Sequence, residues 1–334
     1  MRGTSNLDGV DKVKTLKISQ FAAATAALAV TVMMTGAAQA AQLSGDARSS
    51  IPRDVQQIIV VDYKVMQNSP AAMQLKDRVL PPELKRLESA LKTSGLKVDQ
   101  DADTLAFAAF RDSGGTGTRI LGVAQGQFQT AAILANFAKN KTKPMMYRQN
   151  SIYPMGNAGM SVAFLNQTTM VFGDLAAVKA ALDARDGLQP NFLQNGEMMN
   201  DMTSVDSRAV WSLLDQKGTQ TMMKSVLGEA AQLADYDTVK NRMKSASYTM
   251  DFSNGVKFNM SVVTSDSITA ATAATLMKGV AILKKTSGSP LEKTAMDDTT
   301  IDSSAGTLTV EYSSSDSEFA GLLNSPLFQQ VVTK

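Results

Sequence analysis

The stretch DTLAFAAFRDSGGTGTRILGVAQGQFQTAAILANF, from Asp103 to Phe137, decides the expected fold of this chain. An apolar run at Thr104–Asp112 is followed by Ser113–Gly117, a turn composition, because glycine adopts backbone angles that other residues resist. A return strand is expected at Arg119–Phe128 and a helix at Gln129–Lys139. The stretch therefore predicts a β-hairpin followed by a helix.

The same order recurs between Ala246 and Lys285. Apolar and polar residues alternate from Tyr248 to Phe252 and again from Val256 to Val262, as in a sheet with one solvated face. Between the two runs, Asn254-Gly255 is a strong sequence signal for a tight hairpin turn. A helix is expected to begin near Ser267, whose hydroxyl can cap the first backbone amides.

The elements around each hairpin also follow a common order. The first unit is expected to contain a strand at Ile58–Val61, helices from Ser69, a strand within 144–155, a hairpin at 160–172 and a helix after Asp174. The second unit is expected to contain a strand at Ala209–Leu214, helices at Thr219–Lys244, strands at Thr299–Ser303 and Thr307–Tyr312 and a helix at Ser317–Val332. This order predicts an α+β fold with two similar units of mostly antiparallel sheet and helices packed on one face.

The expected organisation has five segments. They are a signal peptide at 1–40, a flexible lead at 41–56, a first α+β unit at 57–187, a linker at 188–206 and a second α+β unit at 207–334. The linker is placed where proline, glycine, Asp and Asn gather. Trp211 is expected to lie buried on the first strand of the second unit, so its fluorescence would report the unfolding of that unit.

The N-terminal residues match a secretory signal. Three lysines, at 12, 14 and 17, precede an apolar run at Phe21–Met34 and the small-residue sequence Ala38-Gln-Ala40. A membrane anchor is the alternative, but the apolar run is shorter than the roughly 20 residues that span a bilayer. Cleavage after Ala40 is therefore expected, with a periplasmic or secreted product that does not stay inserted in the membrane.

Composition excludes several classes of function. Of the 33 basic and 31 acidic side chains, four basic and two acidic ones lie in residues 1–40, so the remaining chain carries 29 of each and no net charge. Such a balance offers no electrostatic footprint for nucleic acid. The chain has no cysteine and no histidine, which removes disulfides, Ser-His-Asp catalysis and the usual zinc ligand sets. No cofactor is expected, and any catalysis would depend on carboxylates, lysine, serine or tyrosine.

Two short motifs resemble known sites. Asp99, Asp101 and Asp103 alternate as in a calcium loop, but Thr104 and Phe110 stand where that loop needs glycine and glutamate. Ser89-Ala-Leu-Lys92 and Ser94-Gly-Leu-Lys97 match the Ser-x-x-Lys pattern of penicillin-binding enzymes, whose other motifs the chain lacks. A solvated loop and a helix end at Gly95 explain these residues better.

Three further features also have simpler explanations. Thioethers bind copper(I), and the 20 methionines include pairs such as Met145-Met146, yet core packing is the favoured use. Gly114–Gly117 leads into an expected strand, so a hairpin turn is expected there in place of a phosphate loop. Arg111, Arg119 and Arg148 on neighbouring expected strands could face an anionic ligand, although surface arginines paired with Asp112 are the favoured explanation.

Three segments resemble a group of uncharacterised bacterial exported proteins with a duplicated α+β unit. The segments are Ile51-Pro-Arg-Asp54 before the Val60-Val-Asp62 strand, Gly126-Gln-Phe128 opening a helix, and Val171-Phe-Gly-Asp174 leading into another helix. The resemblance covers chiefly Ile51 to Gly187. It implies export and a duplicated α+β fold, and brings no activity, ligand or catalytic residue.

The sequence therefore favours an exported soluble protein that binds an envelope protein or a small ligand without catalysis. The reason is that the chain lacks the residue types of the common catalytic sites, although it can bury a hydrophobic core. The alternative is a carboxylate-based hydrolase with its site in a cleft between the two units. The sequence assigns no catalytic, binding or metal-ligating residue to either function.

Overall fold

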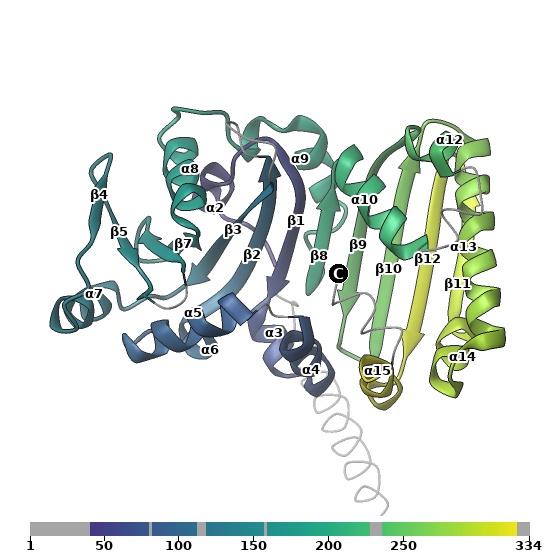
Figure 1. Cartoon of the computed structure of the whole chain (residues 1–334), viewed down its shortest axis with the longest axis horizontal. Helices are drawn as coiled ribbons and strands as arrows, with labels where there is room; N and C mark the ends of the chain where they lie inside the picture. Colours follow the sequence, from purple (N-terminus) through teal and green to yellow (C-terminus); the bar gives the residue numbers. More distant parts are fainter. Residues whose placement is uncertain (1–40, 80–81, 112–117, 157–158, 228–235, 326–334) are drawn as a thin grey trace, which may run out of the picture. The chain divides into compact units, whose positions relative to one another are not determined.

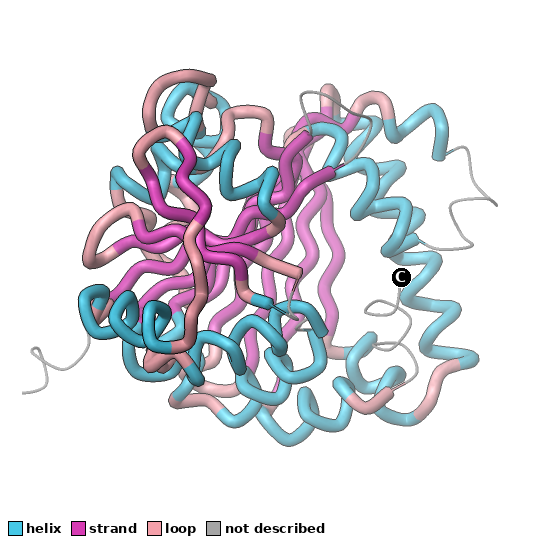
Figure 2. The backbone as a smooth tube through the Cα atoms, turned by 60° about the vertical axis from the view of Figure 1, so that its left-hand side comes forward, coloured by secondary structure: helices cyan, strands magenta, loops and turns pink. Residues whose placement is uncertain are grey.

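The computed structural model describes residues 41–79, 82–111, 118–156, 159–227 and 236–325. These residues form one antiparallel sheet of 12 strands with helices packed along it (Figure 1). Figure 2 shows the strands as a single layer with helices packed against it. The fold class is α+β, as predicted from the sequence.

The strands are β1 (Val55–Asp62), β2 (Ala102–Arg111), β3 (Thr118–Gly126), β4 (Met145–Tyr147), β5 (Asn150–Pro154), β6 (Ser161–Phe164), β7 (Thr169–Gly173), β8 (Val210–Leu214), β9 (Met243–Asp251), β10 (Val256–Thr264), β11 (Thr299–Ser304) and β12 (Thr307–Ser314). The helices are α2 (Gly45–Ser50), α3 (Tyr63–Gln67), α4 (Pro70–Val79), α5 (Pro82–Thr93), α6 (Val98–Asp101), α7 (Thr130–Lys139), α8 (Leu175–Arg185), η2 (Phe192–Gln194), α9 (Gly196–Met202), α10 (Gln216–Leu227), α12 (Tyr236–Lys240), α13 (Ser267–Ser287), α14 (Pro290–Asp297) and α15 (Asp316–Leu323).

Both halves of the sheet have the same strand order. The first half reads β1-β2-β3-β7-β6, continued by β5 and β4, and the second half reads β8-β9-β10-β12-β11. The halves join where β1 and β8 pair antiparallel, with Val60 opposite Trp211. The two expected units therefore share one continuous sheet.

The two halves differ in how helices cover them, and the strand sequences explain why. In β2, Ala106 and Ala108 pack with α8 on one face, while Leu105 and Phe107 pack against α5 on the other. In β10, Val256, Met260 and Val262 are buried, whereas Lys257 and Asn259 are exposed. A strand that is apolar on both faces must be packed against helices on each face. Helices therefore lie on both faces of the first half of the sheet but on only one face of the second half.

The segments expected to be a flexible lead and a linker pack against the rest of the protein. Residues 41–56 contain α2, and Ala41, Leu43 and Ile51 are buried in the same core cluster as Trp211. Residues 188–206 contain η2 and α9, whose Phe192 and Met198 join that cluster. The described residues from 41 to 325 form one compact unit. The sequence prediction of a flexible lead and of a linker between the two units is therefore corrected, because both segments carry apolar residues that the core buries.

Several local predictions are confirmed and others are corrected. Asp174 caps α8, and its carboxylate accepts a hydrogen bond from the amide of Ala177 at 2.8 Å. Asp266, not Ser267, caps α13. The single strand expected within 144–155 is a hairpin of β4 and β5, turning at Arg148 and Gln149, which both have positive φ. The expected turn at 113–117 lies outside the described residues.

The connection from β9 to β10 runs from Phe252 to Gly255 and is longer than the expected two-residue turn. Gly255 has φ of +73°, a conformation that L side chains resist. A Cβ atom there would lie 2.3 Å from the carbonyl oxygen of Ser314 on β12. The glycine is therefore required both by the backbone angle and by the neighbouring strand.

We expect Gly255→Val to lower the free energy of unfolding by more than ~1 kcal/mol, because backbone strain and a backbone clash add together. Urea denaturation measures the change. Gly187→Val is the matched control, since Gly187 has the same φ of +73° but nothing within 4 Å of an added Cβ. Gly255→Val should lose more stability than Gly187→Val, and an unchanged urea midpoint for Gly255→Val would contradict this account.

Candidate functional site

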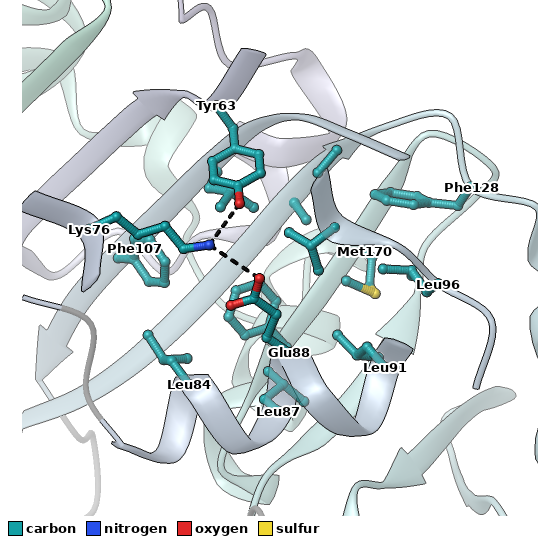
Figure 3. A pocket seen from close by; sticks show the side chains of 15 residues that line it. Tyr63, Lys76, Leu84, Leu87, Glu88, Leu91, Leu96, Phe107, Phe128 and Met170 are labelled. Atoms are coloured by element: carbon teal, nitrogen blue, oxygen red, sulfur yellow. Dashed lines mark hydrogen bonds and ion pairs between the residues drawn. The ribbon is translucent and has the colours of Figure 1, made fainter. Parts of the chain in front are cut away.

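An apolar pocket lies between α5 and the floor formed by β2, β3 and β7 (Figure 3). Its wall comes from α5 and the segment after it, and its floor from strand residues that face α5. The lining residues are Tyr63, Lys76, Leu84, Leu87, Glu88, Leu91, Leu96, Val98, Ala102, Leu105, Phe107, Ala124, Phe128, Met170 and Phe172. Twelve of these fifteen side chains are hydrocarbon or thioether groups, so the interior of the pocket is apolar.

The sequence builds this pocket from two periodicities. Leu84, Leu87 and Leu91 recur three and four residues apart and so share one face of α5. Leu105 and Phe107 are two residues apart on β2 and so share one face of the sheet. The helix stripe and the strand stripe face one another across the pocket.

A small residue at the floor gives the pocket its shape. Gly122 on β3 is paired with Phe172 on β7, and a Cβ at Gly122 would lie 2.1 Å from the Phe172 ring. The missing Cβ lets that ring lie flat over β3, where it meets Phe107 edge to face with ring centroids 6.0 Å apart. Ala124, two residues further along β3, leaves open space above the floor.

The cavity has a volume of about 50 Å³. One water molecule requires roughly 10–15 Å³ by this measure, but a water also needs polar partners, which most of this lining lacks. An empty apolar cavity of this size costs the fold ~1 kcal/mol at about 24 cal/mol per Å³. A small apolar group that fits the space would recover that cost.

One end of the pocket is polar. The Lys76 ammonium on α4 donates hydrogen bonds to the hydroxyl of Tyr63 at 2.8 Å and to a carboxylate oxygen of Glu88 at 3.1 Å. The ammonium also lies 5.1 Å from the centre of the Tyr63 ring. Tyr63 is 2% exposed, and the side chains of Lys76 and Glu88 are 15% and 37% exposed. Figure 3 shows the three groups pointing toward one another, with Phe128 and Leu96 at the other end.

The ammonium of Lys76 is held in its charged form. Burial lowers the pKa of Lys76, but the hydrogen bonds to Tyr63 and Glu88 and the negative charge of Glu88 outweigh burial, and the pKa is raised above its usual value. A lysine that acts as a nucleophile or general base needs a lowered pKa. The polar end is therefore suited to recognition and unsuited to lysine-based catalysis.

The residues of the two short motifs have structural roles. The Asp101 carboxylate accepts a hydrogen bond from the Lys97 amide at 2.7 Å, and Asp103 forms an ion pair with Lys64. The described part of the chain contains no group of three or more acids placed to hold a metal. The hydroxyls of Ser89 and Ser94 donate to carbonyl oxygens one helical turn back, at 3.0 Å each. Gly95, with φ of +89°, follows the end of α5 as predicted.

The three candidate arginines are dispersed and paired. Arg111 donates to Asp215 at 3.0 Å, and Arg119 donates to Asp174 at 3.1 Å. Arg148 forms a 2.6 Å ion pair with Asp183 at the β4 edge, separated from β3 by β7, β6 and β5. The structure does not bring them together on one face, and Asp112, their expected partner, lies outside the described residues.

The structure also places several of the methionines. Met198, Met202 and Met223 are buried in the core, as expected of gap-filling residues, whereas Met146 on the edge strand β4 is 63% exposed. Gly114–Gly117 lies outside the described residues.

A cleft of about 460 Å³ lies near the seam of the two halves, where β1 begins and β8 ends. It contains the carboxylates of Asp54, Glu197, Asp201 and Asp215. The Asp215 carboxylate already has partners, since it accepts hydrogen bonds from Arg111 and, at 2.7 Å, from the amide of Gly218. Burial raises the pKa of Asp201, which the hydrogen bond from Ser245 opposes and the charge of Glu197 reinforces.

Sequence reasoning missed the apolar pocket and its polar end. The leucines of α5 were visible as a helix stripe, but a stripe of this kind is ordinarily buried completely. Tyr63, Lys76 and Glu88 are spread over 26 positions of the chain, and no local pattern links them. Only the packing of α3, α4 and α5 on the sheet brings them together.

The chain was compared with known proteins. No protein-family model matches the sequence, and no curated protein matches it. Among solved structures, crystal form III of TP0453 matches with a TM-score of 0.52 at 9% identity, covering 85% of this chain and 98% of that chain. Crystal form I of TP0453 gives a TM-score of 0.47 at 8% identity, covering 83% of this chain and 95% of that chain. At this identity the likeness concerns the α+β fold alone. Among the described helices, none combines the length and the apolar character needed to cross a membrane.

Proposed function

We propose that this chain is an exported, non-catalytic binding protein whose ligand carries an apolar group into the pocket beneath α5. The observation that supports the proposal is an apolar cavity with a single polar end. Ligand pockets are commonly built in this way, with mostly apolar walls and a few polar groups that fix orientation. The partner class is thus a small molecule, one of the two classes that the sequence favoured.

The proposal includes export and an internal duplication. Export rests on the basic and apolar pattern of residues 1–40, and duplication on the strand order that recurs in the two halves. Mass measurement of the protein from the cell envelope should give a chain that begins at Ala41. A cytoplasmic protein that retains residues 1–40 would contradict export.

Toluene is a suitable probe of the pocket, because it is uncharged and wholly apolar. It is larger than the cavity of about 50 Å³, since a cavity of roughly 150 Å³ holds benzene, so its binding requires the leucines of α5 to move outward. We expect saturable binding of toluene by calorimetry and a raised melting temperature. Ala124→Leu should abolish both, since Ala124 lies on the pocket floor between Leu105 and Met170, and three added carbons fill the cavity.

Ala131→Leu is the control for this experiment, because Ala131 is exposed on α7 and does not line the pocket. Its toluene binding should equal that of the wild type. Circular dichroism checks that Ala124→Leu is folded. Absence of saturable binding by the wild type, or equal binding by Ala124→Leu, would refute the proposed site.

The carboxylate-based hydrolase remains the second proposal, and the raised pKa of Asp201 beside Glu197 is the observation that favours it. In that case Asp201 would act as the proton donor in the cleft at the seam. Hydrolysis of a glycoside panel that is lost in Asp201→Asn would support it. Wild-type protein that leaves all the glycosides intact would count against it.

A further inference from the structure

We infer that the ligand of the pocket is an uncharged amphiphile, with a hydroxyl or carbonyl group at the Tyr63 end and an apolar body directed toward Phe128. This inference rests on the proposed function and adds the chemical class of the ligand. It follows from the charges and hydrogen-bonding groups at the polar end.

The first step concerns charge. Lys76 and Glu88 form an ion pair with atoms 3.1 Å apart, so their two charges compensate one another. The side chain of Lys76 is 15% exposed and lies against apolar walls, where an unbalanced charge is costly. A ligand carboxylate placed beside this pair would add a second negative charge next to Glu88. A neutral head group keeps the balance.

The second step concerns hydrogen bonds. The Lys76 ammonium has three N–H groups, and the contacts among the described residues use two of them, one to Tyr63 and one to Glu88. Because the Tyr63 oxygen accepts from Lys76, its own O–H group remains available as a donor. The polar end therefore offers donors to an incoming oxygen, and the second oxygen of Glu88 can accept from a ligand hydroxyl.

The third step concerns direction. Tyr63, Lys76 and Glu88 occupy one end of the pocket, and Leu91, Leu96, Met170 and Phe128 extend from them toward the other end (Figure 3). A polar group bound at Tyr63 would place an attached hydrocarbon among these side chains. The cavity of about 50 Å³ accommodates only a short group, so a longer chain must displace the leucines of α5.

The test compares 1-octanol with octanoate, two probes with the same carbon number that differ in head-group charge at pH 8. Calorimetry on the full mature chain should show that 1-octanol binds at least tenfold more tightly than octanoate. In Glu88→Gln the preference should invert, because the Lys76 charge then lacks its partner and octanoate supplies one. Glu311→Gln, at an exposed acid on β12 away from this pocket, should retain the wild-type preference.

A second variant covers the case in which Glu88→Gln does not fold. Tyr63→Phe removes one hydroxyl and keeps the ring, so 1-octanol should bind about fivefold more weakly, the factor for one hydrogen bond of ~1 kcal/mol. Toluene binding should not change, since toluene makes no hydrogen bond.

The outcomes separate this inference from the proposed function. If the wild type binds octanoate as tightly as 1-octanol or more tightly, the ligand carboxylate has replaced Glu88 as the partner of Lys76. The inference of an uncharged head group is then overturned, while the proposed site stands. If toluene, 1-octanol and octanoate all fail to bind, the site itself is overturned. Equal 1-octanol binding by the wild type and Tyr63→Phe would also overturn the inference.

Discussion

Replacing Trp211 with alanine is expected to lower the free energy of unfolding by about 3–5 kcal/mol, the range for removing a fully buried aromatic side chain. Trp211 on β8 is 0% exposed and pairs with Val60 on β1, at the seam between the two halves. Its indole N–H donates a hydrogen bond to the carbonyl oxygen of Ala41 at 2.9 Å. The variant therefore loses core packing at the seam and leaves that carbonyl group without its partner.

Urea denaturation followed by circular dichroism measures the loss. Trp211→Phe is the matched control, because it keeps an aromatic ring but cannot donate the hydrogen bond, and its loss should be clearly smaller. Because Trp211 contacts both halves, its fluorescence should change together with the circular dichroism of the whole chain. Two separate transitions, with fluorescence following only one, would show that the two halves unfold independently despite their continuous sheet.

Replacing Ile51 with alanine is expected to cost about 2–5 kcal/mol, the range for a buried aliphatic side chain. Ile51 follows α2, is 0% exposed and belongs to the same core cluster as Phe192. Its carbonyl oxygen accepts a hydrogen bond from the amide of Phe192 at 2.8 Å, and Pro52 forms a bridge with Asn191. Two segments that the sequence suggested to be loose therefore hold one another in place.

The urea midpoint of Ile51→Ala, compared with that of the wild type, measures this contribution. Leu188→Ala is the control within the same region, since Leu188 is 57% exposed and its loss should stay within about 0.5 kcal/mol. An Ile51→Ala midpoint equal to that of the wild type would show that residues 41–56 are a flexible lead after all.

Local sequence signals determined most of the secondary structure. The alternation from Val256 to Val262 gave β10 with its buried and solvated faces, and Asp174 gave the start of α8. These predictions succeed because period and capping act within a few residues of the chain. The predictions fail where contacts with residues distant in the sequence determine the structure, as in 188–206. Polar composition suggested a linker there, but Phe192 and Met198 are buried.

The sequence by itself determined the α+β class, the order of the elements and the absence of histidine and cysteine chemistry. The tertiary structure alone decided that β1 pairs with β8, because strand pairing depends on contacts between residues about 150 positions apart. It also decided the candidate site. The pocket exists because α5 packs over Ala124 and Phe172, and its polar end exists because three helices bring Tyr63, Lys76 and Glu88 within hydrogen-bonding distance. No sequence periodicity predicts that these residues lie close together, since their proximity arises only when separate elements pack on the same face of the sheet.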